Sequence, residues 1–298
     1  MAFISIGIDL GGTHIKAVAL DAENKILHQS SSTTNDNGNE DWKNNLNIAV
    51  EEMKKNFGQG NEIVIGLAAP GITNKEKTAI LYMPGRLQGL ENLNWSEYFH
   101  CPSWVMNDAV AALHAEIKSG AAAGRKNVVL LTLGTGVGGA IVIDGKPYAG
   151  NFQKAGHLGH ITLNSMGECD ITGIPGSLED AIGNCTIGKR SMGKYQSTHE
   201  LIKDYRNENY FAQWVWLTSV RNLAIGIASI TNILSPELVL LGGGITHAGA
   251  DLFEPLESFL ALHEWRPAGN RAEIKQAHFT DFAGAMGAAL FALEQQKL

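Results

Sequence analysis

The sequence predicts an α/β protein in which two copies of one unit face each other across a central cleft. Two glycine-rich turns lie between apolar, strand-like runs, one at Gly11 and one at Gly134. Each is followed by a second strand that ends at an aspartate, Asp21 or Asp144, and these aspartates are as far apart in sequence as the two glycines. Glycine makes up 34 of the 298 residues, above the average of about 7%, so we expect the excess in specific turns.

The first half begins with three strands. FISIGIDL is apolar and strand-like, GGT turns the chain, and IKAVALD runs back to a polar turn at ENK, after which a third strand follows. We then expect a helix over Asp41–Phe57, a strand over Glu62–Ala68, a strand over Ser103–Asn107 and a helix that begins at Asp108.

The second half repeats this order. NVVLLTL, the turn GTGVGG and AIVID form the corresponding hairpin, and GKP makes the next polar turn. The expected elements beyond it are a helix over Tyr210–Leu234, a strand over Glu237–Leu241, a helix over Asp251–His263, a strand over Glu273–Phe279 and a helix over Ala283–Gln295. Each half therefore reads β-β-β-α-β-α-β-α, a hairpin section joined to crossover units.

The chain is long enough for two domains of ordinary size. Because the last helix can pack back on the first half, we expect a smaller N-terminal α/β domain of residues 1–107 plus about 284–298. A larger C-terminal α/β domain is expected over residues 108–283.

Composition and charge exclude several classes of protein. Lys and Arg total 23 against 30 for Asp and Glu, so the net charge of −7 lacks the basic footprint of a nucleic-acid binder. The three cysteines are too few for a disulfide framework, which indicates a reducing compartment. The N-terminus has no basic region typical of a signal peptide, and the charge-free stretch Asn127–Ile143 fits two buried strands better than a membrane span. We expect a soluble, cytoplasmic protein.

The two glycine-rich turns are candidate phosphate sites. The first reads DLGGTHIK and begins at Asp9, and the second reads LGTGVGG. Glycines let backbone N–H groups approach a phosphate closely, and a threonine hydroxyl adds a donor. Either turn by itself could be an ordinary hairpin turn, but both halves of the chain have a glycine-rich turn at the matching position, which favours phosphate binding. The second turn also fits G-x-G-x-x-G, yet a strand rather than a helix follows it, which excludes a dinucleotide-binding motif.

Three further motifs have two interpretations each. Asp108, after Asn107, is either a helix N-cap or a carboxylate at the carboxyl end of a strand, where ligands bind in such folds. The glycines of Leu241–Ile245 either admit a flat ring such as adenine or form a plain strand-to-helix loop. His157 and His160 have a spacing that can bind metal, but such pairs are more often hydrogen-bonded structure.

Together these motifs resemble the ROK family of repressors, open reading frames and sugar kinases, within the sugar kinase/Hsp70/actin superfamily, over essentially the whole chain. The resemblance implies two ribonuclease H-like domains of the actin-like ATPase type. It implies an ATP-dependent kinase that phosphorylates the 6-hydroxyl of a hexose, glucose or a close relative, with Mg²⁺ as cofactor. It also implies a homodimer whose small-molecule partners are the sugar and ATP.

The resemblance assigns a role to each motif. Asp108 is the general base that accepts the proton of the sugar hydroxyl, and Asp9 holds Mg²⁺ directly or through water. The sugar-binding set is Asn107, Asp108, His157, His160 and Glu179. The ATP-binding set is Asp9, Gly11, Gly12, Thr13, Lys16, Gly134, Thr135, Gly136, Gly242, Gly243 and Gly244.

Two regions depart from the family's pattern. His157 stands where the family usually has a glutamate. The positions of the family's zinc-binding cysteines hold Asp170, Thr172 and Ser177, and Cys169 is one residue out of register. We therefore predict no structural zinc, because these residues with one histidine are a poor zinc set.

Two other functions stay open: a sugar-responsive ROK regulator, or a catalytically silent sugar-binding protein without a DNA-binding domain. ROK repressors carry an N-terminal winged helix-turn-helix, and here the first strand is expected from residue 3, which leaves no room for one. Both phosphate turns and Asp108 are present, which favours the kinase over the silent protein.

Overall fold

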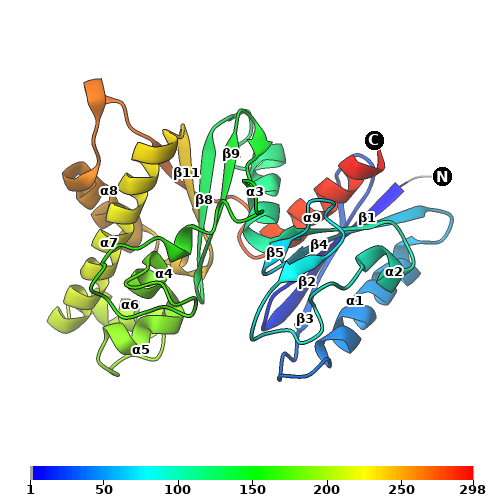
Figure 1. Ribbon diagram of the computed structural model, residues 1–298, viewed down its shortest axis with the longest axis horizontal. Helices are drawn as coiled ribbons and strands as arrows, with labels where there is room; N and C mark the ends of the chain where they lie inside the picture. The colour runs from blue at the N-terminus through cyan, green and yellow to red at the C-terminus, as the bar shows by residue number, and fades with distance from the viewer. Residues whose placement is uncertain (1–2, 298) are drawn as a thin grey trace. The chain divides into compact units, whose positions relative to one another are not determined.

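The computed structural model describes residues 3–297, whose contacts divide the chain into two compact units (Figure 1). The first unit contains the residues up to Ala123, the segment Ala149–Lys154 and the residues from Asp281 onward. The second contains Gly124–Tyr148 and Ala155–Thr280. Each unit has its own sheet and its own hydrophobic core.

The sheet of the first unit has the order β3-β2-β1-β4-β7. β1, β2 and β3 are antiparallel neighbours, whereas β4 and β7 run parallel to β1. Its strands are β1 (Phe3–Leu10), β2 (His14–Leu20), β3 (Ile26–Thr33), β4 (Glu62–Ala69) and β7 (Ser103–Asn107), with a small hairpin of β5 (Ile72–Thr73) and β6 (Ile80–Tyr82). Its helices are α1 (Trp42–Phe57), α2 (Trp95–Phe99), α3 (Asp108–Ser119) and α9 (Ala283–Gln296).

Alternate residues of β1 face opposite sides of this sheet, as strand geometry requires. Ile6 and Ile8 are fully buried in a cluster with Trp42 of α1. Ser5 faces the other side, where its hydroxyl donates to the backbone oxygen of Ala289 in α9 at 2.8 Å. Helices therefore cover both faces of the sheet, which explains why its central strands are apolar nearly throughout.

The C-terminal helix α9 lies so close to the first sheet that a glycine is needed beneath it. A β-carbon on Gly66 of β4 would overlap the backbone of Ala288 in α9. α9 also contacts α3, where Lys118 pairs with Glu294 at 2.6 Å. α3 therefore packs on α9, and both helices belong to the first unit. The domain boundary expected after residue 107 stays a prediction.

The sheet of the second unit has the order β10-β9-β8-β11-β12, with the same pattern of antiparallel and parallel neighbours as the first. Its strands are β8 (Val128–Leu133), β9 (Val137–Ile143), β10 (Lys146–Pro147), β11 (Leu238–Gly242) and β12 (Glu273–Gln276). Its helices are α4 (Leu178–Ile182), α5 (Ile187–Arg190), α6 (Thr198–Arg206), α7 (Tyr210–Leu234) and α8 (Ala250–His263). Four short 3₁₀ turns complete it: η1 (Leu158–His160), η2 (Asn184–Thr186), η3 (Gly244–Ala248) and η4 (Pro267–Gly269).

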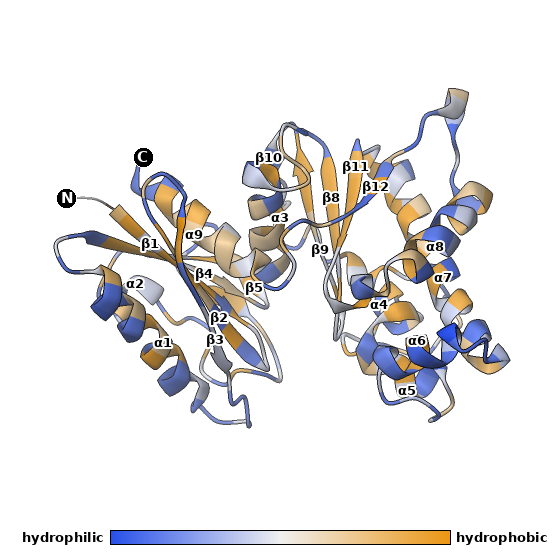
Figure 2. Ribbon diagram, turned by 180° about the vertical axis from the view of Figure 1, so that it is seen from behind, coloured by the Kyte–Doolittle hydropathy of each residue, from blue (hydrophilic) through white to orange (hydrophobic). Residues whose placement is uncertain are grey.

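The long helix α7 is the centre of the second core. By length and composition alone its 25 residues would suit a membrane span. Instead, Trp216 and Leu223 are fully buried in a cluster with Leu241 of β11. The Trp216 indole donates to the backbone oxygen of Asp251 in α8 at 2.8 Å. The strands β8 and β11, which contribute to this core, are coloured orange for hydrophobic residues in Figure 2.

The expected elements are confirmed, with small shifts at their ends. The charge-free stretch Asn127–Ile143 forms β8 and β9, as expected. β11 is displaced by one residue from the expected Glu237–Leu241. β12 ends at Gln276 rather than at Phe279, because its pairing with β11 stops at the partnership of Leu241 with Gln276.

Candidate active site

The first glycine-rich turn, between β1 and β2, is held by its carbonyl groups. The buried Thr34 donates its hydroxyl to the oxygen of Gly11 at 2.6 Å and its N–H to the oxygen of Thr13 at 2.9 Å. The N–H of Gly11 donates to the oxygen of His14 at 3.0 Å, while the Thr13 side chain is exposed. Three hydrogen bonds thus hold the turn, and the Thr13 side chain on it is exposed.

Asp9 is a buried carboxylate at the end of β1. Burial, and next the charge of Asp108, raise its pKa from 3.8 to about 7, against the opposing effect of Lys16. Gly284 of α9 leaves room for this carboxylate, since a β-carbon there would lie 2.6 Å from Oδ2 of Asp9. A carboxylate oxygen is a hard donor of the kind that Mg²⁺ prefers, so the side chain of Asp9 fits the predicted magnesium role.

Asn107, not Asp108, is the N-cap of α3. The side-chain oxygen of Asn107 accepts from the N–H groups of Ala109 at 3.0 Å and Val110 at 3.3 Å, and its amide donates to the oxygen of Gly71 at 3.2 Å. Asp108 is the first residue of α3 and is exposed, with one oxygen accepting from the N–H of Ala109 at 2.8 Å. The interpretation of Asp108 as the cap is therefore wrong, and its carboxylate stands at the carboxyl end of β7.

Arg86 is a candidate that the sequence did not reveal. Its guanidinium lies against the first turn, where a β-carbon on Gly12 would overlap it. The carboxylate of Asp36, itself only 9% exposed, is 3.7 Å from Nε of Arg86 and accepts from the N–H of Leu87 at 3.0 Å. No sequence motif predicts this contact, because Arg86 and Gly12 are far apart in the chain and meet only in the folded structure.

The second turn, between β8 and β9, is held in the same way. The N–H groups of Asn184 and Cys185 donate to the oxygens of Gly134 at 3.0 Å and Thr135 at 2.8 Å. Thr135, like Thr13, is exposed.

The glycine run Gly242–Gly244 lies beside the start of this turn. Gly243 has a φ of 85°, and a β-carbon there would overlap the backbone oxygen of Leu133. The second unit therefore brings together two parts of the predicted ATP-binding set, Gly134–Gly136 and Gly242–Gly244.

Glu179 lies on the second turn. Its Oε2 accepts from the N–H of Val137 at 2.9 Å, and a β-carbon on Gly136 would overlap its carboxylate. The helix α4 carries Glu179, and its N-cap is Ser177, whose hydroxyl accepts from the N–H of Asp180 at 3.2 Å. A residue predicted for the sugar and residues predicted for phosphate are thus in contact within one unit.

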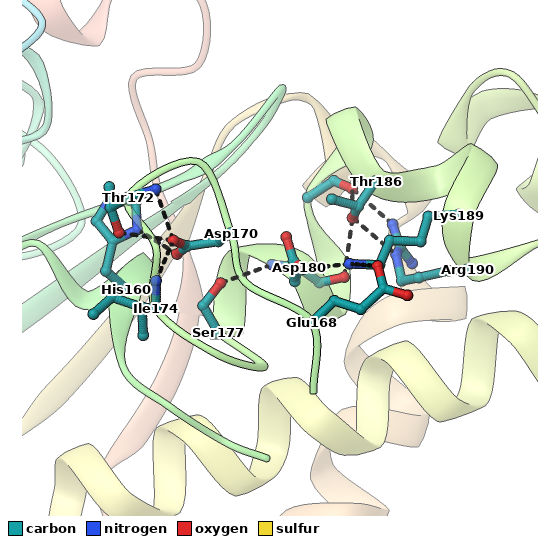
Figure 3. A network of polar contacts seen from close by, with 11 residues as sticks. His160, Glu168, Asp170, Thr172, Ile174, Ser177, Asp180, Thr186, Lys189 and Arg190 are labelled. Atoms are coloured by element: carbon teal, nitrogen blue, oxygen red, sulfur yellow. Dashed lines mark hydrogen bonds and ion pairs between the residues drawn. The ribbon is translucent and has the colours of Figure 1, made fainter. Parts of the chain in front are cut away.

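His160 is hydrogen-bonded to Asp170, with 2.9 Å between Nδ1 and Oδ2 (Figure 3). Burial would raise the pKa of Asp170, but hydrogen bonds from His160, Thr172 and Ile174 outweigh it and hold this pKa well below its usual range. Among residues 3–297 no group of three or more His, Cys, Asp or Glu side chains is arranged to hold a metal. His157 is half-buried at the start of η1, and its role stays a prediction.

The chain is similar to known proteins over nearly its whole length. Residues 5–295 match the ROK family. A ROK hexokinase structure from Thermus thermophilus has a TM-score of 0.84 at 30% identity and covers 99% of both chains. A ROK family glucokinase from Streptomyces griseus, solved with glucose and AMPPNP, gives 0.81 at 24% identity, over 98% of this chain and 99% of its own. A glucokinase from Halalkalibacterium halodurans is 28% identical over 98% of this chain and 95% of its own.

The chain therefore belongs to the ROK family, and its mixed α/β fold is that of the ROK sugar kinases, of the actin-like ATPase type. The family also includes regulators. The xylose repressor of Bacillus spizizenii is 24% identical over 97% of this chain and 77% of its own length.

Proposed function

We propose that the protein is an ATP-dependent sugar kinase that phosphorylates the 6-hydroxyl of a hexose, glucose or a close relative. The position of the Asp108 carboxylate carries this proposal: it is exposed at the carboxyl end of β7 and lies close enough to Asp9 to raise the pKa of that buried group. Asp108 is not the N-cap of α3, because Asn107 has that role. A carboxylate at the carboxyl end of a parallel strand lies where ligands bind in such folds, and there it can accept a proton from a sugar hydroxyl. The glucokinase and hexokinase relatives support the same reaction.

Phosphoryl transfer requires positioning and charge neutralisation more than covalent chemistry from the protein. Gly11, Gly12 and Thr13 with Lys16, and Gly134, Thr135 and Gly136, would hold the ATP phosphates, while Gly242, Gly243 and Gly244 would admit the adenosine. Mg²⁺, held by Asp9 directly or through water, would neutralise charge on the phosphate oxygens. Arg86 adds a positive charge beside Gly12.

The sugar would be held by the remaining predicted residues. Asn107, His157, His160 and Glu179 would bind its hydroxyls, and Asp108 would accept the proton of the attacking hydroxyl. The two units are proposed to be duplicated ribonuclease H-like domains that face a central cleft, whose closure would exclude water from the reaction. Cytoplasmic location, a homodimer and the absence of a nucleic-acid partner complete the proposal.

A ROK regulator or a silent sugar-binding protein is the second candidate, favoured by the match to the xylose repressor. Both would bind sugar without consuming ATP. A screen of ATP consumption with glucose, mannose, allose, fructose, N-acetylglucosamine and N-acetylmannosamine separates the candidates. We expect turnover with at least one aldohexose and product phosphate at the 6-position, established by NMR. Sugar binding in calorimetry without turnover of any sugar would support the second candidate instead.

A further inference from the structure

The carboxylate of Asp170 is buried in the second unit and has hydrogen-bond partners at both of its oxygens. Its side chain is completely buried, whereas that of His160 is 28% exposed. Oδ2 faces Nδ1 of His160 at 2.9 Å. Oδ1 accepts three hydrogen bonds, from the N–H and hydroxyl of Thr172 at 2.8 and 2.7 Å and from the N–H of Ile174 at 3.0 Å. Oδ2 thus contacts the histidine, whereas Oδ1 accepts the hydrogen bonds from the loop (Figure 3).

This arrangement determines where the imidazole carries its proton. A carboxylate can only accept, and the three donors at Oδ1 favour its ionised form. The hydrogen in the contact with His160 must therefore be on Nδ1. In the neutral ring the other nitrogen, Nε2, then carries the lone pair and can accept a hydrogen bond from a hydroxyl.

The loop held by Asp170 also leads into α4. The N–H of Gly173 donates to the backbone oxygen of Asp170 at 3.0 Å, and the chain then reaches Ser177, the N-cap of α4. α4 carries Glu179, whose carboxylate contacts the second glycine-rich turn. One buried carboxylate therefore stabilises the segment between two side chains of the predicted sugar site, His160 and Glu179.

We propose that Asp170 is a positioning residue, which holds His160 in its Nδ1–H form so that Nε2 accepts a hydrogen bond from a sugar hydroxyl. The sugar part of this proposal rests on the proposed kinase function. The part that concerns His160 and Asp170 rests on the four hydrogen bonds alone. A carboxylate that orients a histidine through its second ring nitrogen is a general way to select one tautomer.

The substitution Asp170→Asn tests the proposal, because it replaces the acceptor that faces Nδ1 of His160 with a hydrogen-bond donor. Three donors converge on Oδ1, so the amide oxygen of the asparagine would take that position and its NH₂ group would face His160. Nδ1 would then have to accept, which moves the proton to Nε2. We expect ¹⁵N NMR of the histidine rings to show the Nδ1–H form of His160 in the wild-type protein and the Nε2–H form in Asp170→Asn.

Kinetics provide the second readout. We expect sugar KM to rise by about 3–10-fold in Asp170→Asn, the loss of one hydrogen bond, with ATP KM and kcat changed far less. Glu168→Gln is the matched control, because Glu168 is an exposed carboxylate of the same loop that pairs with Lys189 at 2.9 Å and not with His160. It should keep the wild-type tautomer and the wild-type KM.

Three results would overturn the proposal: an Nε2–H form in the wild-type protein, an unchanged tautomer in folded Asp170→Asn, or equal sugar KM values in Asp170→Asn and Glu168→Gln. The wild-type spectrum decides the tautomer even if Asp170→Asn does not fold. If the wild-type protein shows the Nδ1–H form but phosphorylates no sugar, the proposed function fails, and with it the assignment of Nε2 to a sugar, while the positioning of His160 stands.

Discussion

Asp9 and Asp108 are residues of one type in opposite environments. Asp9 is buried at the end of β1, and Asp108 is exposed at the start of α3. Burial disfavours the charged form of Asp9 and raises its pKa, whereas the exposed side chain of Asp108 is accessible to an incoming hydroxyl. At the scale of residues, this contrast separates the proposed metal ligand from the proposed base.

The substitution Asp108→Asn tests the base. We expect kcat to fall by at least about 100-fold while sugar binding is mostly retained, because the amide cannot accept the proton but keeps the shape of the side chain. Stopped-time phosphorylation assays and calorimetry of sugar binding measure the two effects. Since Asn107 caps α3, near-normal turnover in the folded variant would remove Asp108 from the mechanism.

Asp9 gives the protein a specific pH dependence of stability. Its pKa is raised from 3.8 to about 7 in the folded state. Between these two pH values the folded protein keeps a proton on Asp9 that the unfolded chain has lost. The stability from this group is present below about pH 4 and is lost as the pH rises through about 7. Between pH 5 and 8 we expect Asp9→Asn to lose less stability than the wild-type protein, by on the order of 2 kcal/mol.

Urea unfolding in metal-free buffer at several pH values measures this difference. Asp144→Asn, at an exposed aspartate, is the control and should follow the wild-type curve. Parallel curves for Asp9→Asn and the wild-type protein would contradict the buried, protonated state of Asp9.

Arg86 is tested by removal of its charge. We expect Arg86→Met to raise ATP KM by at least about tenfold, the value of a charge-assisted hydrogen bond to phosphate, with a much smaller change in sugar KM. Lys55→Met removes an exposed charge from α1 in the same unit and should leave both constants unchanged. Equal ATP KM values in the two variants would separate Arg86 from the phosphate site.

At the scale of elements, the position of α9 depends on glycines beneath it. In Gly66→Ala the new methyl group would overlap the backbone of Ala288, which cannot move as a flexible side chain does. We expect a loss of at least about 1–3 kcal/mol in the free energy of unfolding, measured by denaturant titration. Gly188→Ala in α5 is the control, since a β-carbon there meets nothing nearer than the oxygen of Tyr195 at 3.9 Å. Similar stabilities for the two variants would show that α9 is not packed as closely as described.

At the scale of the whole molecule, each unit completes its own core from segments distant in sequence. The first sheet is covered on one face by α9, which comes from the end of the chain. In the second unit, hydrogen bonds to Asp170 stabilise the loop around it.

The loop around Asp170 leads to a prediction about metals for the whole protein. We expect elemental analysis of purified protein to find no tightly held zinc, and EDTA treatment to leave the melting temperature unchanged in the absence of nucleotide, because hydrogen bonds already satisfy Asp170 and His160. About one zinc per chain, with a lower melting temperature after chelation, would contradict this.

The sequence by itself determined the element order, the two corresponding hairpins and the family, because hydrophobic period and glycine-rich turns are local patterns. It left Asp108 open between cap and base, since two adjacent polar residues before a helix can both serve as caps. Only the tertiary structure decided that Asn107 is the cap, that α3 packs with α9, that Arg86 reaches Gly12 and that Asp170 faces His160. These contacts join residues by the packing of separate segments, and no periodicity or spacing in the chain records which surfaces meet.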